Sequence, residues 1–133
     1  MAVDESRLAM IPLFSDLTAG QRSDVAGKLE ERTVAAGTHL SSEGGAGYFF
    51  FVIESGAAEV TRDGETLATF GPGDFFGEAA IFRTRRRTAT VTATSTTTVF
   101  AMFGADFAVL VNEIPSLHDA IEHALADRLP DQD

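Results

Sequence analysis

Short runs of β-branched and aromatic residues alternate with glycine-containing turns between residues 33 and 103. The turn signals recur at intervals of roughly 8–12 residues, which is typical of an antiparallel sandwich or barrel. Asp63-Gly64 is the strongest hairpin signal among these turns. The run YFFFVI is too apolar to face water on either side, so we expect a central strand there. The runs predicted to be strands are THLSSE, YFFFVIES, AAEVTR, ETLATF, TATVTAT and TTTVFAMF.

The pattern changes to helical spacing on the N-terminal side of this region. Thr18 stands in the position of an N-cap, and Gln21 three residues later completes the spacing of a capping box. Val25 and Leu29 then lie on one helix face. The spacing predicts a helix over about residues 18–31.

Two more helices are predicted on the C-terminal side, over about residues 104–129. Pro115 ends the first of them and fits the first turn of the second. We expect the apolar stripe of these helices to pack within the domain, while a dimer seam stays an alternative. The residues of the stripe are Phe107, Leu110, Val111, Ile114, Leu117, Ala120, Ile121, Ala124 and Leu125.

Composition limits the classes of function. The chain has 133 residues, and we expect a single domain over residues 1–133. A net charge of -10 opposes general binding to nucleic acid, because phosphates repel an acidic protein. The chain has no cysteine, which excludes a disulfide framework and thiolate metal sites. No apolar run is long enough to span a membrane, and the acidic start MAVDESR is unlike a signal peptide, so a cytoplasmic location is expected.

A candidate anion site begins at Gly77, directly after the segment GPGDFF. Residues 77–82 can form one helical turn, and the first N–H groups of such a turn lack intrahelical partners and attract an anion. Gly77 permits a close approach, and the small Ala79 and Ala80 leave these amides uncovered. This signal is weak by itself, because Gly-Glu pairs are common.

Four arginines follow within five residues of this acidic chain. The run is compatible with a solvated turn, a patch for a polyanion, or a pocket for one small anion. In TATVTAT the residues Ala89, Val91 and Ala93 alternate with threonines, so the odd positions form the inward, apolar face. Arg87 falls on this register, and an inward guanidinium needs a partner because an unpaired buried charge is very costly. The other arginines are interpreted as solvated or at the edge of the loop: Arg83, Arg85 and Arg86.

Together these features describe a site for a compact anion with a neighbouring hydroxyl group. Backbone amides and Arg87 would hold the anion, while ionised Glu78 would accept the hydroxyl proton. A salt bridge between Glu78 and Arg87 without any ligand remains the alternative. The histidines are too scattered to suggest a metal site and are expected at the surface or the sheet edges: His39, His118 and His123.

The same stretch resembles the phosphate-binding cassette of cyclic-nucleotide-binding domains, the family of bacterial catabolite activators, protein-kinase regulatory subunits and nucleotide-gated channels. The shared pattern is Phe-Gly-Glu, a variable turn, and Arg followed by a small residue and Ala. It is present here as Phe76-Gly77-Glu78 and Arg87-Thr88-Ala89. Residues 43–47, 50–56 and 71–75 resemble further motifs of the family in the same order. Arg86 departs from the pattern, because many members carry Pro there.

The resemblance implies a mainly β fold. We expect an eight-stranded antiparallel jelly-roll-like barrel, flanked by an N-terminal helix and two C-terminal helices. The β-roll would cover about residues 33–103 and the phosphate-binding cassette about residues 76–89.

The resemblance also implies roles for individual residues. Glu78 and Gly77 would bind the ribose, with Glu78 accepting from the 2′-hydroxyl. Val60 would form an apolar wall under the nucleotide. The residues implied for the cyclic phosphate are Arg87, Thr88, Ala79 and Ala80.

The implied ligand is cAMP, and no cofactor is expected. Thr88 would also lie near the base, and in channel-type members a threonine there helps to bind guanine. The choice between cAMP and cGMP therefore stays open at Thr88.

The resemblance implies a non-enzymatic sensor, which relays ligand occupancy through its C-terminal helices to an unknown protein effector. A homodimer through these helices is a further expectation. The alternatives are a protein-interaction module with a degenerate pocket and a regulatory fragment of a longer protein. A metal enzyme on a cupin-like barrel would need clustered histidines and carboxylates. DNA binding by this chain is not expected, because no helix-turn-helix pattern follows the last predicted helix.

Overall fold

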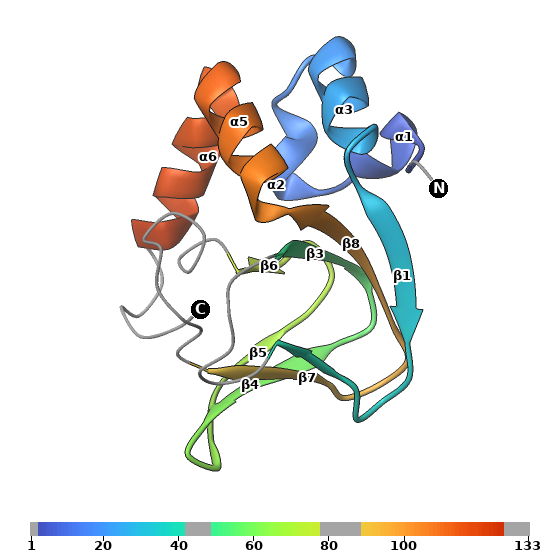
Figure 1. Ribbon diagram of the computed structural model, residues 1–133, viewed down its shortest axis with the longest axis vertical. Coiled ribbons are helices and arrows are strands. Elements are labelled where there is room, and N and C mark those ends of the chain that lie inside the picture. The colour runs from blue at the N-terminus through green and yellow to red at the C-terminus, as the bar shows by residue number, and fades with distance from the viewer. Residues whose placement is uncertain (1–2, 42–48, 78–88, 127–133) are drawn as a thin grey trace.

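The computed structural model describes residues 3–41, 49–77 and 89–126, which form two facing sheets with a layer of helices on one side (Figure 1). In these ranges, strands pair in two four-stranded antiparallel sheets. The first sheet has the order β1-β8-β3-β6 and the second sheet the order β2-β7-β4-β5. The strands are β1 (Glu30–Val34), β2 (His39–Ser41), β3 (Phe49–Ser55), β4 (Ala58–Arg62), β5 (Glu65–Phe70), β6 (Phe75–Phe76), β7 (Thr90–Ala93) and β8 (Thr97–Phe103).

An apolar core fills the space between the two sheets and is called the inner core below. The architecture confirms the predicted mainly β, antiparallel fold with flanking helices. The described strands form two facing sheets rather than one closed barrel. The buried residues of the inner core are Phe51, Ile53, Ala58, Val60, Phe70, Phe76, Ala89, Val91, Val99 and Ala101.

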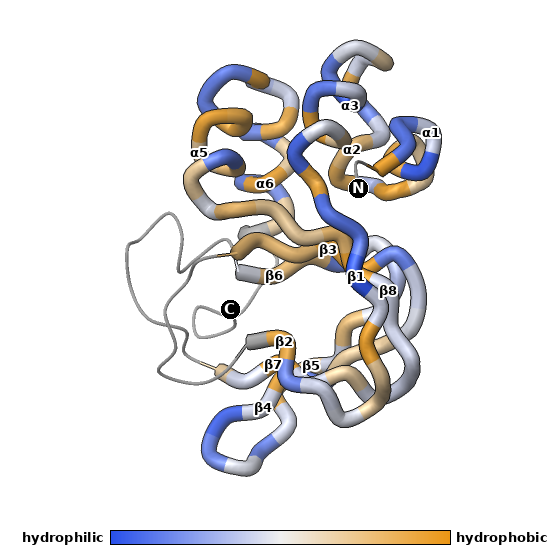
Figure 2. Tube along the Cα trace, turned by 45° about the vertical axis from the view of Figure 1, so that its right-hand side comes forward, coloured by the Kyte–Doolittle hydropathy of each residue, from blue (hydrophilic) through white to orange (hydrophobic). Residues whose placement is uncertain are grey.

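The helices cover the outer face of the first sheet and form a second core with it, the outer core (Figures 1 and 2). Side chains alternate across β3: Phe50 and Val52 point into the outer core, whereas Phe51 and Ile53 point into the inner core. This explains why the segment is apolar on both faces. The strand lies between β8 and β6, which confirms the predicted central strand. The helices are α1 (Glu5–Leu8), α2 (Pro12–Ser15), α3 (Ala19–Ala26), α5 (Gly104–Glu113) and α6 (Pro115–Ala126).

The predicted hairpin at Asp63-Gly64 joins β4 to β5, with Arg62 opposite Glu65. Asp63 has a φ of 54° and Gly64 a φ of 81°. A two-residue hairpin turn with positive φ at both positions suits the twist of the strands, and Asp-Gly tolerates this conformation well.

The N-terminal helices differ in part from the prediction. The capping box is confirmed: the amide of Gln21 donates to Thr18 Oγ1 (3.1 Å), and the amide of Thr18 donates to Gln21 Oε1 (3.0 Å). The helix ends at Ala26 rather than near residue 31, and residues 30–34 pair with β8 as β1. The last residues of the segment that was predicted to be helical, from Glu30 onward, therefore form a strand instead.

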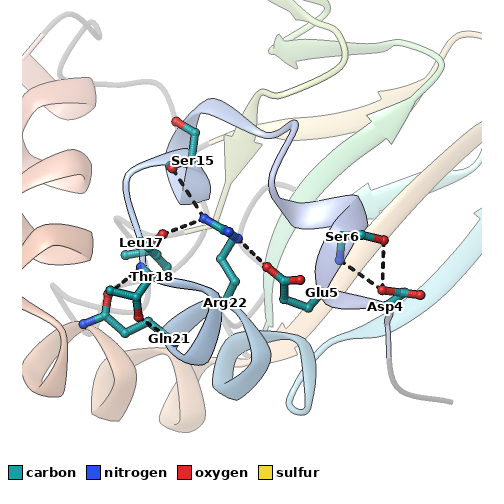
Figure 3. A network of polar contacts seen from close by, with 8 residues as sticks. All are labelled: Asp4, Glu5, Ser6, Ser15, Leu17, Thr18, Gln21 and Arg22. Carbon is teal, nitrogen blue, oxygen red and sulfur yellow. Dashed lines mark hydrogen bonds and ion pairs between the residues drawn. The ribbon is translucent and has the colours of Figure 1, made fainter.

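Two one-turn helices, α1 and α2, precede α3 and were not predicted. Arg22 of α3 fixes this corner (Figure 3): its Nε donates to Glu5 Oε1 (2.6 Å), and its Nη1 donates to the carbonyl of Leu17 (2.5 Å). The carboxylate of Asp4 caps α1 by accepting from the amide of Ser6 (3.0 Å). These contacts hold short helices that four residues could not stabilise alone.

The C-terminal helices follow the predicted pattern, and Pro115 begins α6. Their buried side chains enter the outer core, which confirms packing within the domain. These buried residues are Phe107, Leu110, Val111, Ile114, Leu117 and Ile121. In the described ranges, no helix is long and apolar enough to cross a membrane.

Candidate functional site

Gly77 directly follows β6 of the first sheet and lies near the start of the predicted cassette. Phe76 pairs with Phe51 of β3, and their rings stack with centroids 5.0 Å apart. Gly77 is buried and has a φ of 98°, a conformation that residues with a side chain rarely adopt. The backbone conformation therefore favours glycine at this position. The predicted close approach of an anion favours glycine here too.

The turn before β6 is tied to β3 by backbone hydrogen bonds. The amide of Gly73 donates to the carbonyl of Ile53 (2.8 Å), and the amide of Ile53 donates to the carbonyl of Asp74 (2.9 Å). The carboxylate of Asp74 also accepts from the amide of Gly71 (2.8 Å). These bonds fix the direction in which the chain reaches Gly77.

Ala89 stands at the other end of the predicted cassette. It is fully buried in the inner core, and Val91 and Ala93 of β7 are buried on the same face. Thr90 and Thr92 are only half-buried, so the predicted alternation is confirmed for residues 89–93. Phe76 and Ala89, the first and last residues of the predicted cassette, thus both belong to the inner core.

Five of the predicted site residues lie outside the described residues, and their roles stay predictions. They are Glu78, Ala79, Ala80, Arg87 and Thr88. Of the predicted set, the structure places Gly77, as above, and Val60.

Val60 lies in the middle of the second sheet, opposite Val91 of β7 and Ala68 of β5. Its side chain is fully buried in the inner core. Strand pairing thus puts Val60 on the same inner surface as Ala89, the last residue of the predicted cassette. Its role as a nucleotide wall stays a prediction.

A bulge in β5 adds two apolar side chains to this inner surface. Val60 pairs with Ala68 and Thr61 with Thr66, so Leu67 is the extra residue of the bulge. Leu67 and Ala68 both pack against the inner core and are only partly buried. Sequence reasoning did not single them out, because strict alternation would place just one of them inside.

A surface group on α6 was also missed. His118, Asp119 and Glu122 place possible metal-ligand atoms within 4.8 Å of one another, and all three residues are exposed. His118 Nε2 lies 3.5 Å from Glu122 Oε1, one helical turn away. The scattered histidines gave no sign of this group in the sequence, because carboxylates supply two of its three side chains. His39 and His123 are exposed as predicted.

Comparison with known proteins agrees with the resemblance read from the sequence. Residues 31–113 match the family model of the cyclic nucleotide-binding domain. This range covers most of the chain and includes the strands β2 to β8, all of β1 except Glu30, and the predicted cassette. The chain therefore belongs to the cyclic nucleotide-binding domain family.

Two curated relatives show the breadth of this family. A cAMP-dependent protein kinase regulatory subunit of Yarrowia lipolytica is 44% identical over 88 residues, which cover 65% of this chain and 24% of that protein. A putative potassium channel protein of Rhodopseudomonas palustris is 32% identical over 129 residues, which cover 95% of this chain and 31% of that protein. The chain thus spans about a quarter to a third of the length of these relatives.

One solved structure with the same fold is the regulatory subunit of a cAMP-independent protein kinase A from Trypanosoma cruzi bound to guanosine. The TM-score is 0.81 at 23% identity, and the alignment covers 92% of this chain and 44% of that chain. The likeness shows the fold and does not by itself select a ligand.

Proposed function

We propose that this chain is a non-enzymatic sensor of a cyclic nucleotide, with cAMP as its ligand. The observation that carries the proposal is the position of the two ends of the cassette. Gly77, with its positive φ, and Ala89, on the inward register, both adjoin the inner core. Residues 78–88 carry Glu78 and Arg87 between these two fixed points.

The proposed contacts divide the nucleotide into three parts. Arg87 binds the cyclic phosphate, together with Thr88 and the amides of Ala79 and Ala80. Glu78 accepts a hydrogen bond from the ribose 2′-hydroxyl. Each such charge-assisted bond contributes about 1.5–3 kcal/mol net, so a small number of them supports an affinity of micromolar order.

The base is proposed to lie against the second sheet. Val60 forms the buried part of this wall, and Leu67 and Ala68 offer the partly buried apolar surface next to it. An apolar wall accepts either purine, because stacking and area burial do not depend on the exocyclic groups. Thr88 is therefore the residue proposed to influence the choice between cAMP and cGMP.

A relay from the site to the C-terminal helices is supported by a line of aromatic contacts. Phe75 precedes Gly77 by two residues, and its ring centroid lies 5.7 Å from that of Phe50. Phe50 in turn stacks on Phe107 of α5 with centroids 3.8 Å apart. We propose that ligand binding shifts the position of α5 and α6 through these rings, which passes the signal to a protein effector or a second copy.

The guanosine-bound neighbour raises a second candidate, a sensor of nucleosides without phosphate. The two candidates differ in what Arg87 does. A cyclic-nucleotide sensor needs the phosphate as the partner of Arg87, whereas a nucleoside sensor binds without it.

Isothermal titration calorimetry with cAMP, cGMP and guanosine on the whole chain tests the proposal. We expect micromolar binding of cAMP, binding of cGMP within a factor of about a hundred, and far weaker binding of guanosine. Hydrogen exchange of α5 and α6 should change when cAMP is added. Tight guanosine binding would favour the nucleoside sensor, and no binding at millimolar ligand would favour an interaction module with a degenerate pocket.

A further inference from the structure

A groove of about 730 Å³ lies where α2 packs beside α6. Its walls come from α2, from the turn before β6 and from α6. Among the described residues assigned above to the nucleotide, Gly77, Val60, Leu67 and Ala68 do not line it.

The floor of the groove is apolar. Leu13 and Phe75 form its buried part, with 6% and 5% of their surfaces exposed. On the α6 side the small Ala120 and Ala124 are half-buried and leave the space above them open. Such a floor suits the apolar anchor residues of a bound helix or extended segment.

The rim of the groove is acidic. Asp16, Asp74 and Asp119 line it together with His123, and no lysine or arginine of residues 3–41, 49–77 or 89–126 does. Within the part of the chain that the structure describes, Asp16 and Asp74 form no ion pair. Asp119 has only a 3.7 Å approach to His118.

Several glutamates elsewhere in the described ranges have arginine partners. Glu5 pairs with Arg22 at 2.6 Å, and Glu31 pairs with Arg7 at 2.7 Å. The groove thus combines an apolar floor with Asp16 and Asp74, which have no cationic partner among the residues that the structure describes. A ligand that matches both features carries positive charges beside apolar side chains.

We propose that this groove docks a basic amphipathic segment of a partner protein. A second copy of this chain fits poorly, since its net charge of -10 would repel the acidic rim. Nucleic acid is opposed by the same charges.

The groove also includes a residue of the strand that leads into the predicted cassette. Phe75 lies on its floor and belongs to β6, which ends directly before Gly77. A partner in the groove therefore contacts both α6 and the strand that leads into the cassette. If the proposed nucleotide binding holds, docking and nucleotide occupancy change each other's affinity by the same factor.

The test uses a fluorescein-labelled amphipathic helical peptide of lysine and leucine, titrated by fluorescence anisotropy at physiological ionic strength without nucleotide. We expect saturable binding to the whole chain. The double variant Asp16→Lys/Asp119→Lys should weaken it at least about tenfold, because like charges at an interface are strongly unfavourable. The matched variant Asp24→Lys/Glu65→Lys has the same net charge but leaves the groove intact, and it should bind within about threefold of the unmodified chain.

A neutral variant separates shape from charge. Ala124→Gln keeps the net charge and places a longer side chain in the groove, so it should weaken binding several-fold while far-ultraviolet circular dichroism stays unchanged. Equal weakening by both lysine double variants would show attraction to net charge alone and overturn the proposal. Absence of binding to the unmodified chain would also overturn the proposal. Concentration-dependent self-association that Ala124→Gln abolishes would overturn it as well, since a second copy would then occupy the groove. Because nucleotide is absent, these outcomes do not depend on the proposed sensor function.

Discussion

Arg7 of α1 joins the N-terminal helices to the first sheet. Its guanidinium forms a two-bond contact with Glu54 of β3 and a 2.7 Å hydrogen bond with Glu31 of β1. The same group lies 5.0 Å from the ring centroid of Phe100. The hydrogen bond from Arg7 lowers the pKa of Glu31 below its ordinary value, because it stabilises the charged carboxylate.

This contact predicts a loss of stability in acid. Below the ordinary glutamate pKa of 4.5, the unfolded chain takes up a proton on Glu31 before the folded chain does. The contribution of the pair is therefore complete above that pH and is lost as the pH falls through the lowered pKa. Urea unfolding between pH 5 and pH 3 should show a smaller loss of stability for Arg7→Met than for the unmodified chain. Lys28→Met removes an exposed cation elsewhere and should behave like the unmodified chain, whereas equal pH slopes for all three proteins would contradict the account.

Residue-level predictions succeeded where the cause was local. Thr18 and Gln21 are three positions apart, and the capping box follows from this spacing alone. The partners Arg7 and Glu54 are 47 positions apart, and nothing in the local sequence pairs them. Only the folded chain brings α1 beside β3.

Strands and long helices could be predicted because each repeats its pattern over several residues. The one-turn helices α1 and α2 have four residues each, which is too short to show a helical period. The bulge in β5 also has no sequence signal, although it decides that Leu67 and Ala68 both face the inner core. Element type was therefore predictable, while short elements and local irregularities depended on tertiary contacts.

Docking of α5 on the first sheet depends on one aromatic contact that can be tested. Phe107 is 1% exposed and stacks on Phe50, whereas Phe103 at the end of β8 is 61% exposed. Phe107→Ala should lower the free energy of unfolding by about 3–5 kcal/mol, the usual range for a buried phenylalanine. Phe103→Ala removes the same atoms at the surface and should lower it by at most about 1.5 kcal/mol. Urea titration measures both, and equal losses would contradict the packing described for α5.

At the scale of the whole molecule, the inner core organises the site. It contains Phe76 and Ala89, the first and last residues of the predicted cassette. The sequence predicted this framework through strand register and through the order of its motifs. It could not predict the acidic groove, because α2, the turn before β6 and α6 meet only in the folded chain.

The central claim is that Arg87 binds the cyclic phosphate. Calorimetric titration of cAMP against Arg87→Ala and Arg83→Ala tests it directly, since each variant removes one arginine from the same short run. Arg87→Ala should weaken binding by about 2–5 kcal/mol, as expected when one partner of a desolvated charge pair is removed. Arg83→Ala should leave the affinity within about twofold, because this arginine is predicted to be solvated. Equal cAMP affinity of Arg87→Ala and the unmodified chain would contradict the account.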